Sequence, residues 1–360
     1  MTKVLLTGGG TAGHVMGNLA ILPGLLDKGY DVFYVGSHTG LENEIIDKNK
    51  IRYYAISSGK LRRFISFQNF LDIFKVAKGI LDARAVLKKE KPDVIFSKGG
   101  YVTVPVAIAA STMKIPFIGH ESDFTPGLAN KLAAKFADKM LVTFPETEDS
   151  FGEKGITVGS PIRKELFSGK RDTGLGFLGF DGIKPVLLIM GGSMGSVTIN
   201  NVVFENLDEL LKRFDIVHLV GKGNRNSSLP DTSHYRQFEY ISDELKDILA
   251  ATDFVVGRSG SNSIFEFLAL KLPNLLIPLD LEASRGDQIL NAESFKKMGY
   301  SMVLREKDIT HKSFIGSLDE LIQRKDEFKK NMENTKMGDA VDKILKIIDD
   351  TLKNKGKTRV

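Results

Sequence analysis

Four short segments combine small residues with side chains that can move protons or bind phosphate. They read GGGTAGH at 8–14, HESD at 120–123, GGSMGS at 191–196 and RSGSNSIFE at 258–266. Histidine exchanges protons near neutral pH, and glycine-rich turns let backbone N–H groups approach an anion. The sequence therefore indicates proton transfer and phosphate binding in one protein.

The first segment formally matches the GxGxxG fingerprint of dinucleotide-binding turns. That fingerprint also needs an acidic residue at the end of the second strand, where it binds the ribose diol. Here the second strand ends VGSH at 35–38, without a carboxylate. A nicotinamide-dependent oxidoreductase is therefore disfavoured. His14, at the start of the following helix, is the candidate general base, and a plain glycine turn is the alternative.

The two segments of the second half suit a nucleotide. Ser193 adds a hydroxyl donor to a glycine turn that leads into a helix. In the later segment, Ser261 or Ser263 can cap a helix, and Glu266 lies one turn in, where a carboxylate can accept both hydrogen bonds of a ribose diol. A plain turn and a capping-box acid are the structural alternatives.

The segment at 120–123 and one further segment, at 287–292, carry polar side chains after expected strands. HESD at 120–123 suggests acid–base work or sugar contacts, and DQILNA at 287–292 offers amide and carboxylate groups to sugar hydroxyls. The sequence has no convincing metal-ligand spacing, no GxSxG and no Walker A loop, so hydrolase and P-loop functions are disfavoured.

An apolar run precedes each of these segments, and a helical pattern follows most of them. We expect strands at 3–7, 31–36, 94–97, 116–119, 139–143, 185–190, 216–220, 254–257 and 274–279, and helices at 17–28, 197–213 and 341–353. A Gly-rich, low-order stretch through Gly182 follows GSPI at 159–162 and separates the halves. The alternation predicts an α/β fold of two doubly wound parallel-sheet domains, with ligands in the cleft at the carboxyl ends of the strands.

Composition sets wider limits. The chain has 360 residues, a net charge of +5 and no cysteine, which excludes a disulfide scaffold and a thiol enzyme. It contains no signal-peptide core at its start and no run of about 18 apolar residues that could span a bilayer. The mild basicity is compatible with phosphates, nucleic acid or an anionic membrane as partners.

The order and spacing of the segments at 8–14, 120–131, 191–196 and 258–266 resemble the MurG family of glycosyltransferase family 28. The segments SGKLRR at 58–63 and SRGDQ at 284–288 look most like those of family members from low-GC Gram-positive bacteria. The resemblance implies a GT-B fold and inverting transfer of N-acetylglucosamine from UDP-N-acetylglucosamine to the muramyl 4-hydroxyl of lipid I, forming lipid II. It implies no cofactor, no metal and no nucleic acid, and a peripheral protein on the cytoplasmic side of the cell membrane, with cell-wall synthesis proteins as further partners.

The resemblance also implies the division of labour. Residues 1–162 would form the acceptor and membrane-binding domain, 163–338 the donor domain, and 339–360 a helix returning to the first domain. His14 is the favoured base and Glu121 its rival. The substrate-binding residues would be Thr11, Ala12, Gly13, Asp123, Arg163, Ser193, Ile241 (uracil), Ser261, Asn262, Ser263, Glu266 (ribose) and Gln288 (sugar hydroxyls). Asp123 and Asp287 depart from the family's pattern.

Membrane binding is expected from one amphipathic helix. Its apolar positions are Phe67, Phe70, Leu71, Phe74 and Leu81, its cations are Lys60, Arg62, Arg63, Lys75 and Lys78, and Ile73 and Ile80 are expected to face the core. The alternative is that the phenylalanines are simply core. Two alternative functions also stay open, which are a related transferase acting on diacylglycerol and a non-catalytic nucleotide-sugar binding module.

Overall fold

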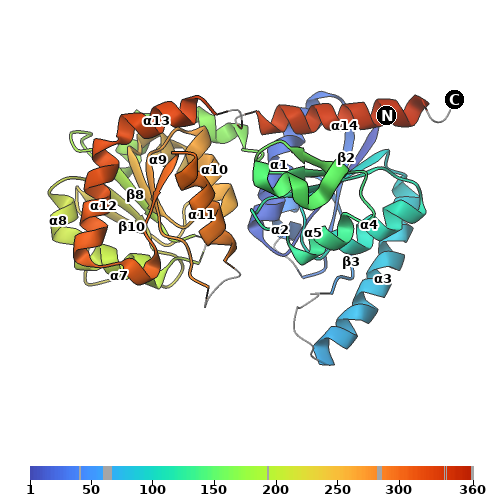
Figure 1. Cartoon of the computed structure of the whole chain (residues 1–360), viewed down its shortest axis with the longest axis horizontal. Coiled ribbons are helices and arrows are strands. Elements are labelled where there is room, and N and C mark those ends of the chain that lie inside the picture. The colour runs from blue at the N-terminus through green and yellow to red at the C-terminus, as the bar shows by residue number, and fades with distance from the viewer. Residues whose placement is uncertain are drawn as a thin grey trace. The chain divides into compact units, whose positions relative to one another are not determined.

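The computed structural model describes residues 1–39, 42–59, 67–192, 194–281, 286–335, 337 and 339–357 (Figure 1). The chain forms two compact units, Met1–Arg163 with Asp339–Val360, and Lys164–Gly338. Each unit is built on one parallel sheet with helices on its faces, which confirms the expected α/β class.

The first unit contains a seven-stranded sheet in the order β3-β2-β1-β4-β5-β6-β7. The strands are β1 (Lys3–Thr7), β2 (Asp31–Ser37), β3 (Arg52–Ile56), β4 (Val94–Ser97), β5 (Phe117–Glu121), β6 (Lys139–Val142) and β7 (Gly155–Thr157). The helices are α1 (Ala12–Asp27), α2 (Glu42–Lys48), α3 (Phe67–Glu90), α4 (Thr103–Thr112), α5 (Leu128–Ala133), η1 (Pro145–Lys154) and α14 (Ala340–Lys357).

Alternation along β1 divides the core of this unit into two layers. Val4 and Leu6 belong to a cluster that includes residues of α1 and α14, whereas Leu5 belongs to a cluster with residues of α3, α4 and α5. Neighbouring residues of a strand point to opposite faces, so a sheet covered on both sides needs such a continuous apolar run. The cores thereby hold the carboxyl ends of the strands in fixed register.

Helix α14 returns the end of the chain to the first unit. Leu345 packs so closely on α1 that a Cβ added at Gly24 would lie 2.4 Å from its Cδ1. The Asp349 carboxylate accepts hydrogen bonds from Lys28 Nζ and the Tyr30 hydroxyl, both at 2.8 Å. The apolar stripe of α14 is therefore covered by the first unit.

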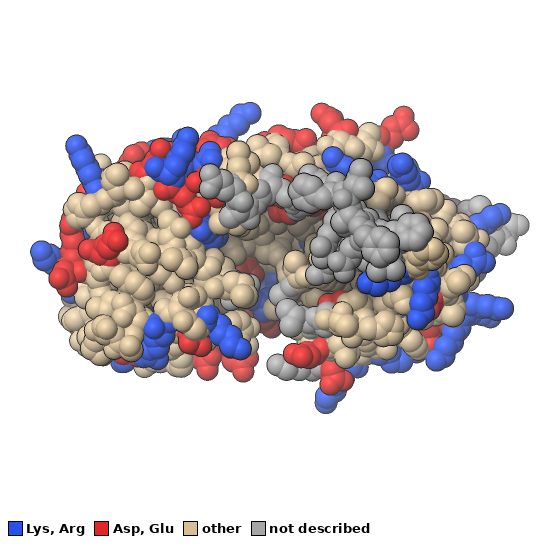
Figure 2. Space-filling model, turned by 90° about the horizontal axis from the view of Figure 1, so that it is seen from below, with Lys and Arg blue, Asp and Glu red and all other residues tan. Residues whose placement is uncertain are grey.

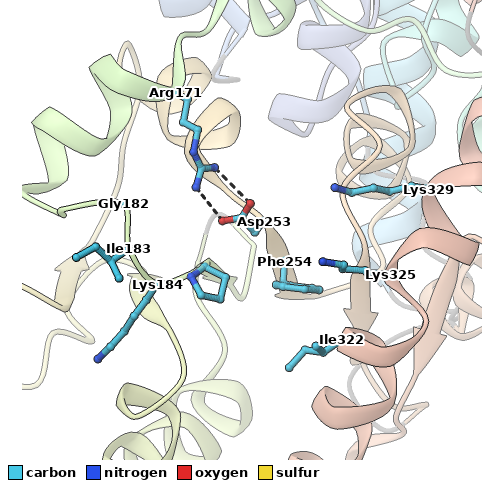
Figure 3. Close-up of a pocket in the computed structure, with 10 residues that line it drawn as sticks. Arg171, Gly182, Ile183, Lys184, Asp253, Phe254, Ile322, Lys325 and Lys329 are labelled. Atoms are coloured by element: carbon cyan, nitrogen blue, oxygen red, sulfur yellow. Dashed lines mark hydrogen bonds and ion pairs between the residues drawn. The ribbon is translucent and has the colours of Figure 1, made fainter.

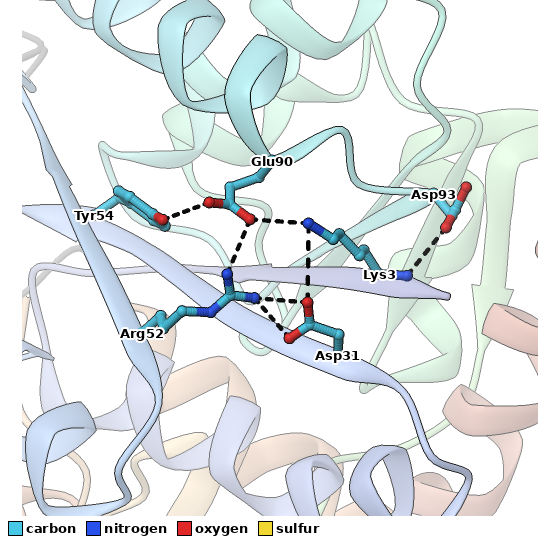
Figure 4. A network of polar contacts seen from close by, with 6 residues as sticks. All are labelled: Lys3, Asp31, Arg52, Tyr54, Glu90 and Asp93. Carbon is cyan, nitrogen blue, oxygen red and sulfur yellow. Dashed lines mark hydrogen bonds and ion pairs between the residues drawn. The ribbon is translucent and has the colours of Figure 1, made fainter. Parts of the chain in front are cut away.

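A polar network lies at the amino-terminal ends of the strands of the same sheet, opposite the carboxyl ends (Figure 4). The buried Glu90 carboxylate, at the end of α3, accepts from the Tyr54 hydroxyl at 2.5 Å, from Lys3 Nζ at 3.2 Å and from Arg52 at 3.1 Å. The Tyr54 hydroxyl and the two cations hold the pKa of Glu90 below its usual range. Arg52 also binds Asp31, so the network joins β1, β2, β3 and α3.

The second unit contains a six-stranded sheet in the order β10-β9-β8-β11-β12-β13. Its strands are β8 (Val186–Met190), β9 (Asp215–Leu219), β10 (Tyr235–Phe238), β11 (Phe254–Gly257), β12 (Asn274–Leu276) and β13 (Ser301–Val303). Its helices are η2 (Lys164–Ser168), α6 (Arg171–Leu178), α7 (Val197–Glu205), α8 (Leu207–Leu211), α9 (Leu245–Ala251), α10 (Ser261–Ala269), α11 (Asp287–Lys297), η3 (Glu306–Asp308), α12 (His311–Gln323) and α13 (Lys325–Glu333).

Two expectations about this unit were wrong. The stretch expected to be low in order contains α6, because Gly169 and Gly174 let this segment lie directly against α9. An added Cβ there would meet the carbonyl oxygens of Lys246 and Asp247 at 2.0 and 2.1 Å. The single helix expected over 197–213 breaks at Asn206, whose side chain donates to the Val202 carbonyl at 2.6 Å and competes with the backbone ladder.

Candidate functional site

All strand pairs in both sheets are parallel, so within each unit the strand ends meet at one edge. The strand order reverses between β1 and β4 in the first sheet and between β8 and β11 in the second. Ligands of doubly wound sheets bind outside the carboxyl ends at such switch points. The glycine segments at 8–14 and 191–196 directly follow β1 and β8, so each lies at its own switch point.

His14 lies in the first turn of α1, which begins at Ala12 and not at 17 as expected. Its Nδ1 lies 2.9 Å from the Gly9 carbonyl oxygen and 3.1 Å from Thr11 Oγ1. Because a carbonyl only accepts, the neutral ring carries its proton on Nδ1 and its lone pair on Nε2. This tautomer leaves Nε2 as the atom that can accept a proton from a substrate hydroxyl.

The glycine turn at 8–14 contacts a second glycine turn, at 99–100, which follows β4. The Gly9 amide donates to the Gly99 carbonyl at 3.2 Å. Gly100 has φ +88°, and a Cβ there would lie 1.9 Å from the Gly9 carbonyl oxygen, the same oxygen that binds His14. The position of His14 thus depends on a close approach that only glycine permits.

Glu121, the rival base, is buried at the end of β5. Its Oε1 accepts from the Asp123 amide at 3.0 Å, and its Oε2 accepts from the Gly127 amide and from Asn130 Nδ2, both at 2.9 Å. Burial raises the pKa of this carboxyl. The contacts describe a side chain that shapes the 122–127 loop, and we therefore keep His14 as the candidate base.

Lys98 was not predicted from the sequence; it follows β4 and is fully buried. Its Nζ donates to His120 Nδ1 at 2.9 Å and to Ser122 Oγ at 2.8 Å. Burial lowers the pKa of this lysine to about 7, against the opposing effect of Glu121 and Asp123. No recognisable motif marks a lysine next to two glycines. Its hydrogen-bond partners, His120 and Ser122, lie at the end of β5 and just after it, which is a separate segment of the chain.

In the second unit, a buried hydroxyl and an arginine connect the turns after β8 and β11. Ser196 caps α7 by accepting from the Ile199 amide at 3.3 Å. Arg258 donates to Ser196 Oγ at 2.7 Å and to Glu306 at 2.6 Å. Ser193 lies outside the described residues. The arginine thus holds the two turns in register.

Helix α10 begins differently from the expectation. Its N-cap is Gly260, with no side-chain capping bond, whereas Ser261 or Ser263 was expected to cap it. The extended backbone at Gly260, with φ −63° and ψ 136°, lets the helix start one residue earlier. Glu266 then lies in the second turn and too far along to form a capping box, whose acid stands at the third helical position.

The remaining donor-site predictions also fall at the carboxyl edge of the second sheet. Gln288, in the first turn of α11, accepts from the Leu279 amide through Oε1 at 3.1 Å, and its carbonyl accepts from Ser259 Oγ at 2.7 Å. The turns after β11 and β12 therefore meet at Gln288. Ile241 follows edge strand β10 and is buried.

Arg163, expected with the donor half, is the last residue of the first unit. The segment before it is anchored there, because the Gly159 carbonyl accepts from His120 Nε2 at 3.0 Å. Thr11 is the N-cap of α1, Ala12 and Gly13 open its first turn, and Asp123 lies in the loop held by Glu121. The individual roles of these residues in binding stay predictions.

A cavity of about 390 Å³ lies elsewhere on the second unit (Figure 3). It is lined by Arg171, Gly182, Ile183, Lys184, Pro185, Asp253, Phe254, Ile322, Lys325 and Lys329. Pro185 precedes β8 and Phe254 opens β11, so the cavity lies at the amino ends of the strands, away from the glycine turns. Arg171 and Asp253 form an ion pair beside it at 3.1 Å.

Helix α3 projects beyond the sheet of the first unit (Figure 1). Phe74 and Leu81 are 60% and 67% exposed, so for Phe74 the alternative of a core position is wrong. Ile80 is half-buried. The side chains of Phe67, Phe70, Leu71 and Ile73 lie outside the description, as do residues 60–66 with Lys60, Arg62 and Arg63. None of the described helices has the length and apolarity needed to cross a membrane.

Two family models match the chain, the glycosyltransferase family 28 N-terminal domain over residues 4–142 and its C-terminal domain over 186–346. A Clostridium tetani protein named UDP-N-acetylglucosamine–N-acetylmuramyl-(pentapeptide) pyrophosphoryl-undecaprenol N-acetylglucosamine transferase is 50% identical over 355 residues, which are 98% of this chain and 99% of that protein. A Clostridium perfringens protein of the same name is 51% identical over 347 residues, covering 96% and 97%.

Solved structures support the fold. The crystal structure of Acinetobacter baumannii MurG matches with a TM-score of 0.74 and 21% identity, covering 97% of this chain and 100% of that one. A structure described as a UDP-N-acetylglucosamine 2-epimerase from Listeria monocytogenes has the same TM-score at 12% identity, covering 98% and 97%. The fold thus hosts more than one named activity, and structural likeness alone does not select between them.

Proposed function

The chain belongs to glycosyltransferase family 28, and on that premise we propose that it transfers N-acetylglucosamine from UDP-N-acetylglucosamine to the muramyl 4-hydroxyl of lipid I, forming lipid II. The observation that carries the proposal is the 50% identity to the named transferase over 98% of the chain, which includes every glycine turn at the two switch points. The His14 tautomer supports the proton-transfer step.

Acceptor-dependent UDP release tests this function. We expect UDP to form from UDP-N-acetylglucosamine only when a lipid I analogue is present, and not with diacylglycerol in its place. Release with diacylglycerol alone would assign the protein to a different lipid acceptor. Binding of UDP-N-acetylglucosamine without release under either condition would identify a non-catalytic module.

The reaction divides into two chemical tasks. His14 Nε2 would take the proton of the 4-hydroxyl while that oxygen forms the new bond to the anomeric carbon. The bond from the anomeric carbon to the phosphate oxygen breaks, and its electron pair leaves with UDP. The uncapped start of α10 in the second unit would stabilise the charge on the departing diphosphate.

Glu266 is proposed to bind the ribose diol of the donor. Glu266→Ala should weaken the binding of UDP by about 1–3 kcal/mol, because the two ribose hydroxyls lose a charged hydrogen-bond acceptor. Calorimetry with UDP measures the change. The matched control is Glu293→Ala, which removes an exposed carboxylate of α11 in the same unit and should leave UDP affinity unchanged. Equal affinity in Glu266→Ala and wild type would overturn the ribose assignment.

We also propose that α3 docks on an anionic membrane. Phe74, Lys78 and Leu81 follow at spacings of four and three, so they share one helix face that is exposed to solvent. Lys75 lies beside this stripe, and on the face shown in Figure 2 Lys and Arg side chains gather over the first unit. Apolar side chains can enter the acyl boundary while the lysines meet anionic headgroups.

Replacing Lys75 and Lys78 with glutamine should lower binding to phosphatidylglycerol vesicles roughly 30-fold at low salt, since each cation contributes about 1 kcal/mol. Co-sedimentation measures the binding. The control is Lys325→Gln with Lys329→Gln, an exposed i, i+4 pair on α13 that removes the same charge from the second unit. If the control lowers binding as much as the α3 pair, net charge and not α3 governs docking.

A further inference from the structure

Lys98 is a buried cation at the switch point of the first sheet, where β1 and β4 lie side by side. Its side chain runs beneath α1, since a Cβ added at Gly17 would lie 2.4 Å from Lys98 Cε. His14 lies one turn before Gly17 on that helix. The Lys98 side chain therefore extends from the end of β4 to the helix that carries His14.

The far end of Lys98 holds the loop after β5. The Gly159 carbonyl accepts from His120 Nε2 at 3.0 Å, which places the ring proton on Nε2 and leaves Nδ1 to accept from Lys98 at 2.9 Å. Ser122 Oγ accepts from the same ammonium at 2.8 Å. Burial lowers the pKa of His120 well below its usual range, so the ring is neutral and the charge of the pair resides on Lys98.

Several titratable groups surround the ammonium. Glu121 on β5 and Asp123 in the following loop attract the ammonium, and His120 on β5 accepts a hydrogen bond from it. His14 on α1 contributes to the lowering of the pKa of His120. The carboxylate of Glu121 is engaged with the loop backbone through the amides of Asp123 and Gly127. Lys98 is thus a poorly solvated cation at the switch point of the first sheet, where ligands of doubly wound sheets bind.

We propose that Lys98 is a positioning residue for the acceptor, whose ammonium fixes the 122–127 loop and provides the buried positive charge that favours the acceptor's pyrophosphoryl group. The inference rests on the proposed function, in which the first unit binds a pyrophosphoryl lipid. Because the charge is poorly solvated, its effect on a nearby anion is stronger than that of a surface lysine. A neutral amine can still donate to His120 and Ser122, so deprotonation removes the charge and keeps the loop.

The proposal predicts how acceptor binding depends on pH. The pKa of Lys98, lowered by burial to about 7, means that the ammonium is lost as pH rises above neutrality. KM for a short-chain lipid I analogue should rise roughly tenfold between pH 6.5 and 8.5, whereas KM for UDP-N-acetylglucosamine stays constant. Lys98→Met should raise the acceptor KM at pH 6.5 by at least roughly tenfold and make it independent of pH.

The matched control is Lys135→Met, which removes an exposed lysine of the same unit and should keep the wild-type pH profile. If wild type makes no product from the lipid I analogue, the proposed function fails. If wild type turns over and its acceptor KM is flat in pH, or if Lys98→Met keeps the wild-type profile, the role of Lys98 is overturned.

Two measurements keep the proposal testable should Lys98→Met fold poorly. Ser122→Ala removes one partner of the ammonium and should raise the acceptor KM without changing UDP binding. A carbon-13 titration of the Lys98 side chain in wild type should show an inflection near pH 7 that moves upward when the lipid I analogue binds. An inflection that the analogue leaves unmoved would separate Lys98 from the acceptor.

Discussion

His14→Ala is expected to lower turnover by about 10²–10⁴-fold while UDP binding stays within a few-fold of wild type. The variant removes the imidazole ring whose Nδ1 contacts the Gly9 carbonyl, and it leaves the second unit untouched. The loss should appear in kcat. Steady-state kinetics with a lipid I analogue, together with UDP calorimetry, measures both effects.

The control is His38→Ala, which removes an exposed histidine of the same unit, just after β2, and should keep wild-type turnover. Near-normal turnover in His14→Ala would show that another group accepts the proton. Glu121→Gln would then be the next variant, although the contacts of Glu121 predict that this change mainly loosens the 122–127 loop.

Gly100→Ala should destabilise the first unit by roughly 2–5 kcal/mol and abolish turnover. The new Cβ would lie 1.9 Å from the Gly9 carbonyl oxygen, and the backbone has φ +88°, which disfavours any side chain. Relief of the clash must move the first glycine turn, and His14 loses its carbonyl partner. Chemical denaturation and turnover measure the two consequences.

Gly29→Ala separates the clash from the backbone conformation. Gly29 has a similar φ of +72°, but nothing lies within 4 Å of its Cβ position. Gly29→Ala should therefore lower the free energy of unfolding by only about 1 kcal/mol, with turnover unchanged. Equal stability of Gly100→Ala and Gly29→Ala would mean that the two glycine turns do not depend on their close approach.

The strands that position the site were predictable because their patterns are local. Apolar runs at 3–7, 94–97 and 254–257 coincide with β1, β4 and β11. The turns that follow these strands are recognisable in the sequence by their glycines. The start of α1 was placed late because Gly13 lowers helix propensity in the first turn. At Gly17, the absent Cβ makes room for Lys98, a reason that no local pattern contains.

The chemistry of the site was less accessible, because it depends on contacts between distant segments. His120 and Glu121 were recognised as titratable groups after a strand, yet the structure shows both engaged in holding backbone and neighbouring side chains. Lys98 carried no signal of its own. Its buried position and its partners on β5 exist only once β4 and β5 pair in the sheet.

The most direct test of the proposed activity is the identity of the product. The protein is incubated with labelled UDP-N-acetylglucosamine and a lipid I analogue, and the lipid product is analysed by mass spectrometry and by the anomeric coupling of the new linkage. We predict one N-acetylglucosamine added per UDP released, joined with inverted configuration to the muramyl 4-hydroxyl. A product with retained configuration, a sugar on another acceptor, or UDP release without a disaccharide would contradict the account.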